Sequence, residues 1–157
     1  MTTPDVFDLV YDFNDKAGLI KAGYSDSRES AFQIEEALEG FNIAELSRNI
    51  TDYRYSTDSA KELARYILTD ECFIGTDVER LDKACDAIIF AIGSMAKLGL
   101  SPEQMRQALD IVVKANLAKL SMPKDEYGKL TKPADWEQYA PEKELQLILD
   151  KRKPSGQ

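Results

Sequence analysis

The sequence contains no histidine among its 157 residues. This absence excludes zinc sites of the HExxH type, Ser-His-Asp and Cys-His nucleophiles, and the Glu-x-x-His pairs of di-iron bundles. Cysteine is scarce as well: only Cys72 and Cys85 occur, and no metal-ligand spacing such as CxxC joins them. We expect two reduced thiols, with Cys85 in the core. Any chemistry therefore has to use carboxylates, lysines, hydroxyl groups and bound metal.

Long apolar runs are also missing. The longest, residues 87–92, is far shorter than the roughly 20 residues that cross a membrane. The first residues lack the pattern of a secretory signal, so we expect a cytoplasmic protein without membrane contact. The 28 acidic residues outnumber the 20 basic ones, and the net charge of -8 argues against binding of polymeric nucleic acid. A small phosphorylated ligand is compatible with this charge if a divalent cation lies between carboxylate and phosphate.

The length and the 43% hydrophobic content are typical of one folded domain, which we place at residues 1–150 with a polar tail at 151–157. No segment alternates as a strand does, whereas apolar residues recur at helical spacing. Pairs that resemble capping boxes mark four helix starts: Asp26 with Glu29, Ser59 with Glu62, Thr76 with Glu79, and Ser101 with Gln104. The predicted helices are Pro4–Lys16, Ser27–Ile50, Asp58–Leu68, Asp77–Leu98, Pro102–Leu120 and Pro141–Leu149.

This pattern predicts an all-α fold, a helical bundle of about five to six helices. The helix over 77–98 has the clearest apolar seam, formed by Leu81, Cys85, Ile88, Ile92 and Met95. One chain with this many amphipathic helices is unable to cover every apolar stripe, so we expect a homodimer or homotetramer built from the long helices.

Two predicted helices carry acidic residues at helical spacing. Glu35, Glu36 and Glu39 form an EExxE cluster on one helix, and Asp82 and Asp86 lie four residues apart on another, beside its apolar seam. If the two helices pack through their seams, the carboxylates converge on one cavity suited to Mg²⁺ or Mn²⁺. Exposed acidic faces are common, so an EExxE cluster taken alone is more often solvated surface than a metal site. The aspartates favour a site more strongly, because aspartate is a poor helix former and both lie next to core positions.

Five segments resemble, in order, motifs of the all-alpha nucleoside triphosphate pyrophosphohydrolases. This superfamily contains the MazG-like proteins, phosphoribosyl-ATP pyrophosphohydrolase and the dimeric dUTPases. The segments are Phe13–Gly18 for the FHxxFG opening, with Asn14 in the place of histidine; Ile34–Glu39 for EExxE; Asp82–Ile88 for DALADLL; Ala115–Lys119 for ANMSK; and Gly128–Lys132 for GKxxK.

The resemblance implies an Mg²⁺-dependent enzyme that cuts nucleoside triphosphates to a monophosphate and pyrophosphate, at a site between the two acidic helices that oligomerisation completes. Magnesium, with Mn²⁺ as a substitute, would be held by Glu36, Glu39, Asp82 and Asp86. Glu35 would orient or deprotonate the attacking water. The residues implied in substrate binding are Asn14, Asn116, Lys119, Lys129 and Lys132.

Two departures from the family pattern leave alternatives open. Lys83 stands where many members have a metal-binding glutamate, and an ammonium group there is able to replace a cation. A non-catalytic helical interaction protein with a degenerate metal site therefore stays possible. The interval from Glu39 to Asp82 is also longer than usual, by about the length of the predicted helix 58–68. Hydrolysis of phosphoribosyl-ATP is a second alternative, because it cuts the same bond.

Overall fold

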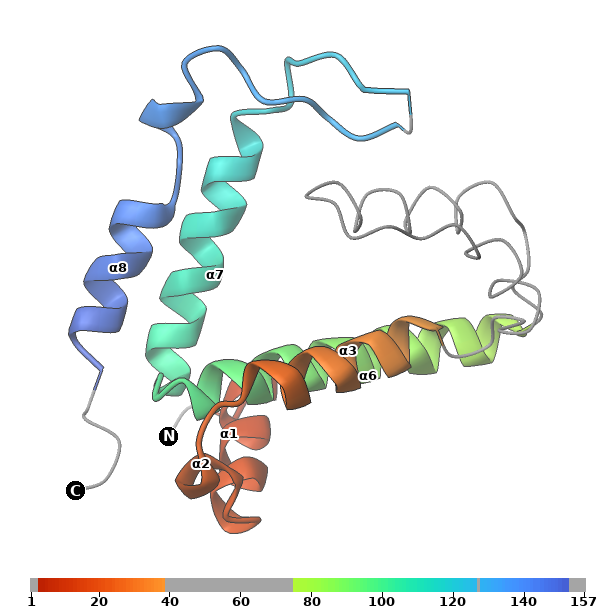
Figure 1. The fold of residues 1–157 in the computed structure, drawn as a ribbon, viewed down its shortest axis with the longest axis vertical. Helices are drawn as coiled ribbons and strands as arrows, with labels where there is room; N and C mark the ends of the chain where they lie inside the picture. Colours follow the sequence, from red (N-terminus) through yellow and green to blue (C-terminus); the bar gives the residue numbers. More distant parts are fainter. Residues whose placement is uncertain (1–2, 39–74, 127, 153–157) are drawn as a thin grey trace. The chain divides into compact units, whose positions relative to one another are not determined.

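The computed structural model describes residues 3–38, 75–126 and 128–152 (Figure 1). The helices in these ranges are α1 (Val6–Lys16), α2 (Leu19–Ala22), α3 (Asp26–Leu38), α6 (Asp77–Lys97), α7 (Pro102–Leu117), the 3-10 helix η1 (Trp136–Gln138) and α8 (Glu142–Asp150). Within these ranges there is no strand, only an isolated antiparallel bridge between Lys124 and Leu130. The predicted all-α fold is confirmed. The helix predicted over 58–68, and residues 39–50 of the second predicted helix, lie outside the described residues.

Two of the predicted capping boxes are confirmed. At the start of α6, the backbone N–H of Glu79 donates to the Thr76 hydroxyl at 3.3 Å, and the Glu79 carboxylate accepts from the Thr76 backbone. At the start of α7, Gln104 N donates to Ser101 Oγ at 3.3 Å, and Ser101 N donates to Gln104 Oε1 at 3.0 Å. These bonds satisfy N–H groups that have no partner inside the helix, which is why the chain turns helical at these residues.

The capping box predicted for Asp26 and Glu29 is wrong. Helix α3 already includes Asp26, and the hydroxyl of Ser25 accepts from the backbone N–H of Arg28 at 3.5 Å. Glu29 faces the protein interior instead, with only 2% of its surface exposed. The buried ammonium group of Lys97 attracts the Glu29 carboxylate away from the start of the helix. Sequence spacing alone does not reveal this contact.

The described chain forms two compact units. The first comprises Met1–Glu29 and Ile89–Gln157, and the second comprises Ser30–Ile88. Helices α3 and α6 each begin in one unit and end in the other. The first unit contains a buried core contributed by α1, α6, α7 and α8, whose members are Val10, Ile92, Ala96, Leu100, Met105, Ala108 and Ile148. Burial of one such large side chain contributes about 1.5–3 kcal/mol, so this cluster is the main support of the first unit.

The apolar seam of α6 is buried over only part of its length. Ile92 is 4% exposed, whereas Leu81 is 67% and Ile88 56% exposed. Cys85 is exposed as well, so its predicted place in the core is wrong. Among the α6 residues, the core of the first unit therefore includes only those from Ile92 onward.

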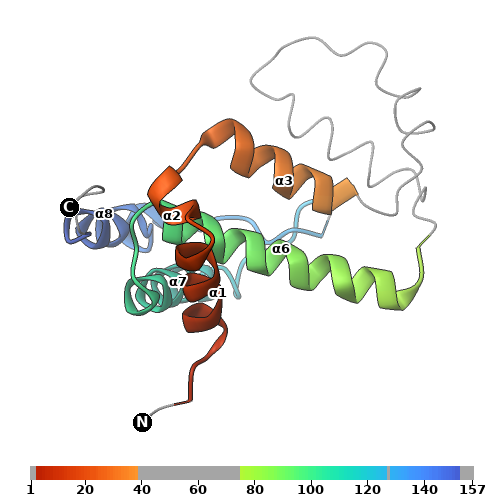
Figure 2. The ribbon, with the colours of Figure 1, turned by 90° about the horizontal axis from the view of Figure 1, so that it is seen from below.

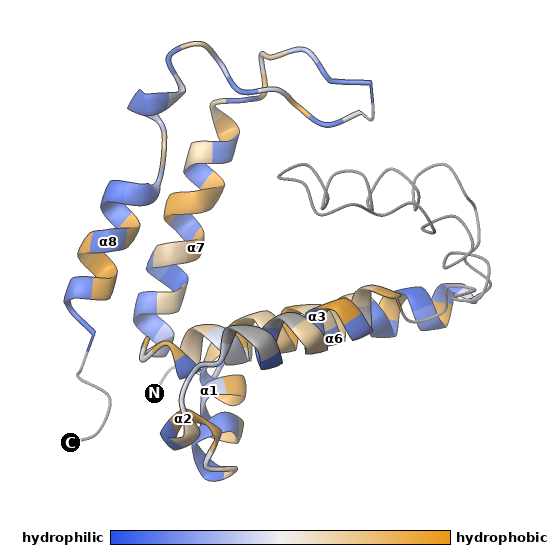
Figure 3. Ribbon diagram, viewed as in Figure 1, coloured by the Kyte–Doolittle hydropathy of each residue, from blue (hydrophilic) through white to orange (hydrophobic). Residues whose placement is uncertain are grey.

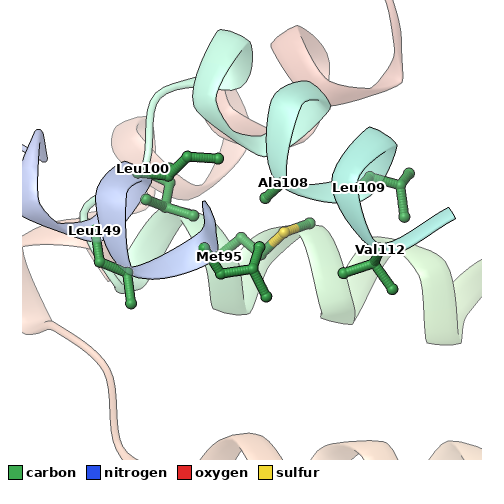
Figure 4. A pocket seen from close by; sticks show the side chains of 8 residues that line it. Met95, Leu100, Ala108, Leu109, Val112 and Leu149 are labelled. Carbon is green, nitrogen blue, oxygen red and sulfur yellow. The ribbon is translucent and has the colours of Figure 1, made fainter. Parts of the chain in front are cut away.

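Helices α7 and α8 are antiparallel neighbours in the first unit (Figure 1). Apolar residues recur along both helices (Figure 3), and between them lies an open pocket of about 290 Å³ (Figure 4). Its walls are apolar side chains, among them Met95 of α6, Leu109 and Val112 of α7, and Leu149 of α8. Because the pocket offers no charged group, it is unsuited to a phosphate.

Helix α1 is fastened to α7 by one arginine. Arg106 donates two hydrogen bonds to the carboxylate of Asp5, both at 2.8 Å, and a third to Asp8 at 2.8 Å. Asp5 is also the N-cap of α1, accepting from the backbone N–H groups of Phe7 and Asp8. The guanidinium therefore holds the pKa of Asp5 well below its usual range.

No single helix in the described ranges is long and apolar enough to cross a membrane. Only α6 and α7 taken together reach that length and apolarity, as a pair bent by 116°.

Candidate functional site

Three of the predicted acidic site residues are described, and all three belong to the second unit. Glu35 is exposed on α3, Asp82 is exposed on α6, and Asp86, one turn later on α6, is half-buried. The capping box at Thr76 fixes where α6 begins and thereby places Asp82 and Asp86 on consecutive turns. The two acidic stretches are therefore parts of one compact unit.

Lys83 joins these two stretches directly. Its Nζ donates to the backbone carbonyl of Ala37 at 2.9 Å, across 46 residues of sequence. Ala37 lies inside the EExxE motif, so the bond places the beginning of α6 beside the end of α3, as Figure 2 shows. The ammonium also brings a positive charge to the last turn of α3, where helix carbonyls without helical partners favour one.

The donor chemistry of this unit fits a hard cation. Glu35, Asp82 and Asp86 offer only carboxylate oxygens, which are the ligands that Mg²⁺ prefers. Glu39 and the side chain of Glu36 lie outside the described residues. Among the residues that are described, no three Asp, Glu or Cys side chains are grouped so as to hold a metal ion. The four-carboxylate magnesium site stays a prediction.

The remaining predicted site residues lie in the first unit, and Asn14 is the most buried of them at 4% exposure. Its Nδ2 donates to the backbone carbonyl of Val10 at 2.8 Å. A Cβ atom added at Gly93 would stand 3.1 Å from the same Nδ2, so the asparagine packs directly on the α6 backbone. This contact gives Asn14 a packing role, and its predicted part in substrate binding stays a prediction.

Lys119 and Lys132 converge on the only tryptophan of the sequence. The Nζ atoms of Lys119 and Lys132 lie 4.7 Å and 5.2 Å from the centre of the Trp136 ring. Lys119 also donates to Asn116 Oδ1 at 2.6 Å. Three of the predicted substrate-binding residues therefore form one cluster with Trp136, at the end of α7 and in the segment that leads to α8.

The loop between α7 and η1 holds Lys132 in this position. Thr131 donates to the Pro123 carbonyl through its backbone N–H at 3.0 Å and through its hydroxyl at 2.8 Å. Farther along the loop, Lys129 N donates to Asp125 Oδ1 at 2.8 Å, in a turn completed by Gly128 at φ 81. Lys129 itself is exposed, and its ammonium has no contact with the Trp136 ring among the described residues.

A buried polar cluster in the first unit was not predicted from the sequence. Lys97 Nζ lies 3.0 Å from both carboxylate oxygens of Glu29, and Ser94 Oγ donates to Glu29 Oε2 at 2.7 Å. Burial alone would raise the pKa of Glu29, but the bonds from Ser94 and Lys97 outweigh it, so the pKa is lowered. One signal was available: Ser94 and Lys97 are one turn apart and interrupt the apolar residues at the end of α6.

Comparisons with known proteins identify no relative: no protein-family model, no curated protein and no solved structure matches the chain. The candidate site therefore depends on its own residues and their geometry.

Proposed function

We propose that the chain is an Mg²⁺-dependent nucleoside triphosphate pyrophosphohydrolase that removes unwanted ribonucleoside or deoxyribonucleoside triphosphates. The observation that best supports this function is the pairing of two acidic helix segments within one compact unit, joined by the bond from Lys83 to Ala37. The five motifs in family order provide the second support.

Glu36, Glu39, Asp82 and Asp86 would hold the metal ion. When bound, magnesium neutralises phosphate oxygens and lowers the pKa of water near it. The carboxylates contribute by fixing the position of that charge. Their mutual repulsion, otherwise unfavourable on a helix, is then balanced by the cation.

Glu35 is the proposed base. Its carboxylate takes a proton from water as the water oxygen forms a bond to the α-phosphorus. The bond from that phosphorus to the bridging oxygen breaks, and pyrophosphate leaves with the electron pair. Asn116, Lys119, Lys129 and Lys132 would donate hydrogen bonds to the phosphates and offset their negative charge.

A pyrophosphate-release screen tests this proposal. Ribonucleoside and deoxyribonucleoside triphosphates are each supplied with Mg²⁺ or Mn²⁺, and the variants Glu39→Gln and Asp86→Asn are compared with the wild type. We expect both variants to lose about 100-fold in rate or more, since each removes a charge from the metal site. Glu142→Gln, an exposed carboxylate of α8, is the matched control. Equal turnover by the site variants and the control would refute the assignment.

Phosphoribosyl-ATP is the alternative substrate, because its hydrolysis breaks the same bond. Supplying it in the same screen separates the two activities. A preference for phosphoribosyl-ATP over every nucleoside triphosphate would replace nucleotide clean-up with a biosynthetic role.

The bond from Lys83 to Ala37 favours a third reading, a non-catalytic helical protein in which an ammonium replaces the metal. Magnesium bound at millimolar concentration would raise the melting temperature of an intact site by mass action. Absence of that rise, together with absence of pyrophosphate release from any nucleotide, would support the non-catalytic reading. Lys83→Gln distinguishes the cases further, because it should create magnesium-dependent stabilisation in a degenerate site.

We further propose that the protein forms a homodimer or homotetramer. Large apolar side chains remain exposed along α1 and α7: Leu9 is 60%, Phe13 64% and Leu117 56% exposed. Leu9 and Phe13 lie four residues apart on α1, and neighbouring exposed apolar side chains are typical of interaction sites. A monomer by light scattering across micromolar concentrations would refute the proposal.

A further inference from the structure

Two lysine ammonium groups from different segments contact a single indole ring, that of Trp136. The two distances of 4.7 and 5.2 Å share one end at the centre of the Trp136 ring, so the ammonium groups of Lys119 and Lys132 lie at most 9.9 Å apart. Each contact with the ring contributes only about 0.5–1 kcal/mol at an exposed site. Asp135 and Glu137 flank Trp136 in the sequence, yet no ion pair in the described ranges joins them to either lysine.

Each of the two lysines is held in place by its own segment of the chain. Lys119 lies in the turn that ends α7, where the partial negative charge of the helix end favours a cation, and Asn116 fixes its Nζ at 2.6 Å. Lys132 follows Thr131, whose two bonds to Pro123 hold the loop. The Trp136 backbone N–H donates to the Pro133 carbonyl at 3.1 Å. Two compact positive charges from separate segments are thus held at one indole ring.

The charge arrangement selects a class of ligand. Lysine ammonium groups act as point charges for phosphate, and a single carboxylate offers one charge for two cations. Two linked phosphates carry several negative charges over a short span, so one such group satisfies both lysines together.

We propose that Trp136 is a positioning residue that holds Lys119 and Lys132 as one binding site for two linked phosphates. This site would bind one part of the substrate of the proposed function, and it rests on that function in one respect: the ligand would be the part of the nucleotide that leaves as pyrophosphate. Pyrophosphate itself is the simplest probe of the site.

Trp136 also provides the measurement, because it is the only tryptophan and its emission responds to nearby charge. Pyrophosphate is titrated into the intact protein without divalent metal while indole fluorescence is followed. We expect a saturable change that weakens with added salt. Lys119→Gln and Lys132→Gln should each weaken binding by about 3- to 10-fold, and the double variant should abolish it. Lys143→Gln, an exposed lysine of α8, is the matched control and should bind like the wild type.

Trp136→Leu and Trp136→Phe test the positioning role by calorimetry, since they lose the fluorescence signal. Phenylalanine keeps a weaker aromatic face, so Trp136→Phe should retain more pyrophosphate affinity than Trp136→Leu. With a nucleotide substrate, Trp136→Leu should raise KM several-fold and leave kcat nearly unchanged, because the contacts are made before the transition state as well as in it. A merely structural role would lower the melting temperature of both variants equally and give no rescue by phenylalanine.

The outcomes separate the two proposals. No fluorescence change, an equal response in the double variant, or an equal response to phosphate and sulfate would overturn the pyrophosphate site. Lysine-dependent binding of pyrophosphate with no turnover of any nucleotide would support the site and refute the enzymatic function. If a nucleoside triphosphate binds through both lysines and a nucleoside monophosphate does not, the site is supported. The nucleotide is then the source of the linked phosphates.

Discussion

The buried pair of Glu29 and Lys97 makes the strongest prediction about stability. The side chain of Glu29 is 2% exposed and that of Lys97 6% exposed, so neither charge is solvated. Removing one member of a buried pair typically costs about 3–5 kcal/mol, because the other charge stays buried without its partner. For Lys97→Met we expect the lower end, about 3 kcal/mol, since Ser94 and Arg28 still donate to the carboxylate. Methionine keeps the apolar stem of the lysine in place.

Replacing both charges should reverse most of that loss. In Glu29→Leu/Lys97→Met, the Ser94 hydroxyl no longer donates to Glu29 and directs its one hydrogen to the Phe90 carbonyl 3.0 Å away, and Arg28 keeps its bond to the Gly23 carbonyl. No buried charge is left unpaired. We expect the free energy of unfolding of the double variant to lie within about 1 kcal/mol of the wild type, because apolar substitutes for buried ion pairs are often neutral or stabilising.

Urea denaturation followed by Trp136 fluorescence measures these differences in the unit that contains the pair. A loss of about 3 kcal/mol corresponds to a fall in melting temperature of roughly 6–12 °C for a protein of this size. The reasoning is refuted if Lys97→Met unfolds within about 0.5 kcal/mol of the wild type. It is also refuted if the double variant loses the sum of the two single losses, since the residues would then be energetically independent.

The pH dependence of the same pair has a definite sign. The folded pKa of Glu29 is lowered, so near pH 4 the folded state binds fewer protons than the unfolded chain. Stability from the pair is therefore present above the unfolded glutamate pKa of about 4.3 and is lost as the pH falls through the lowered value. The difference between wild type and Glu29→Gln should shrink between about pH 5 and pH 2.

Three smaller predictions concern the surface and the helix contacts. Asp5→Asn keeps a good N-cap but removes the charge that Arg106 binds, so it should lower the melting temperature at pH 7. At a pH below the lowered pKa of Asp5, the wild-type carboxyl is itself uncharged and the substitution should have little effect. An equal fall in melting temperature under both conditions would contradict this. Gly93→Ala should cost about 1 kcal/mol, because its Cβ would crowd Asn14, and should become neutral or stabilising in an Asn14→Ala background. Cys85 should react with a thiol reagent in the folded protein, so the wild type should consume more reagent than Cys85→Ser; equal consumption by the two would show that Cys85 is covered.

Local sequence signals predicted the helix starts well. The boxes at Thr76 and Ser101 depend on residues three apart, and the predicted starts at Asp77 and Pro102 match α6 and α7. Burial was harder to predict: the α6 seam has an even apolar spacing, yet only its later part lies in the core. Periodicity shows which face of a helix is apolar, but whether another element covers that face depends on the tertiary fold.

The candidate site likewise contains contacts within one helical turn and contacts between distant segments, and only the first kind follows from residue spacing. Asn116 and Lys119 are three residues apart at the end of α7, a separation that brings side chains together within one helical turn, and a hydrogen bond joins them. Spacing gave no reason to pair Lys119 with Lys132 through Trp136, or Glu29 with Lys97. These contacts join segments distant in sequence, so no helical period encodes them.

The Glu29–Lys97 contact has a consequence for how the chain can change over evolution. It ties together residues 68 positions apart, on either side of the stretch that forms the second compact unit. For the unfolded chain, the entropy cost of bringing the two ends of such a stretch together grows slowly, by only about 0.6 kcal/mol for each doubling of its length. Insertions between the two acidic stretches thus carry little penalty for the first unit. The long interval between Glu39 and Asp82 is therefore the kind of variation that this contact tolerates.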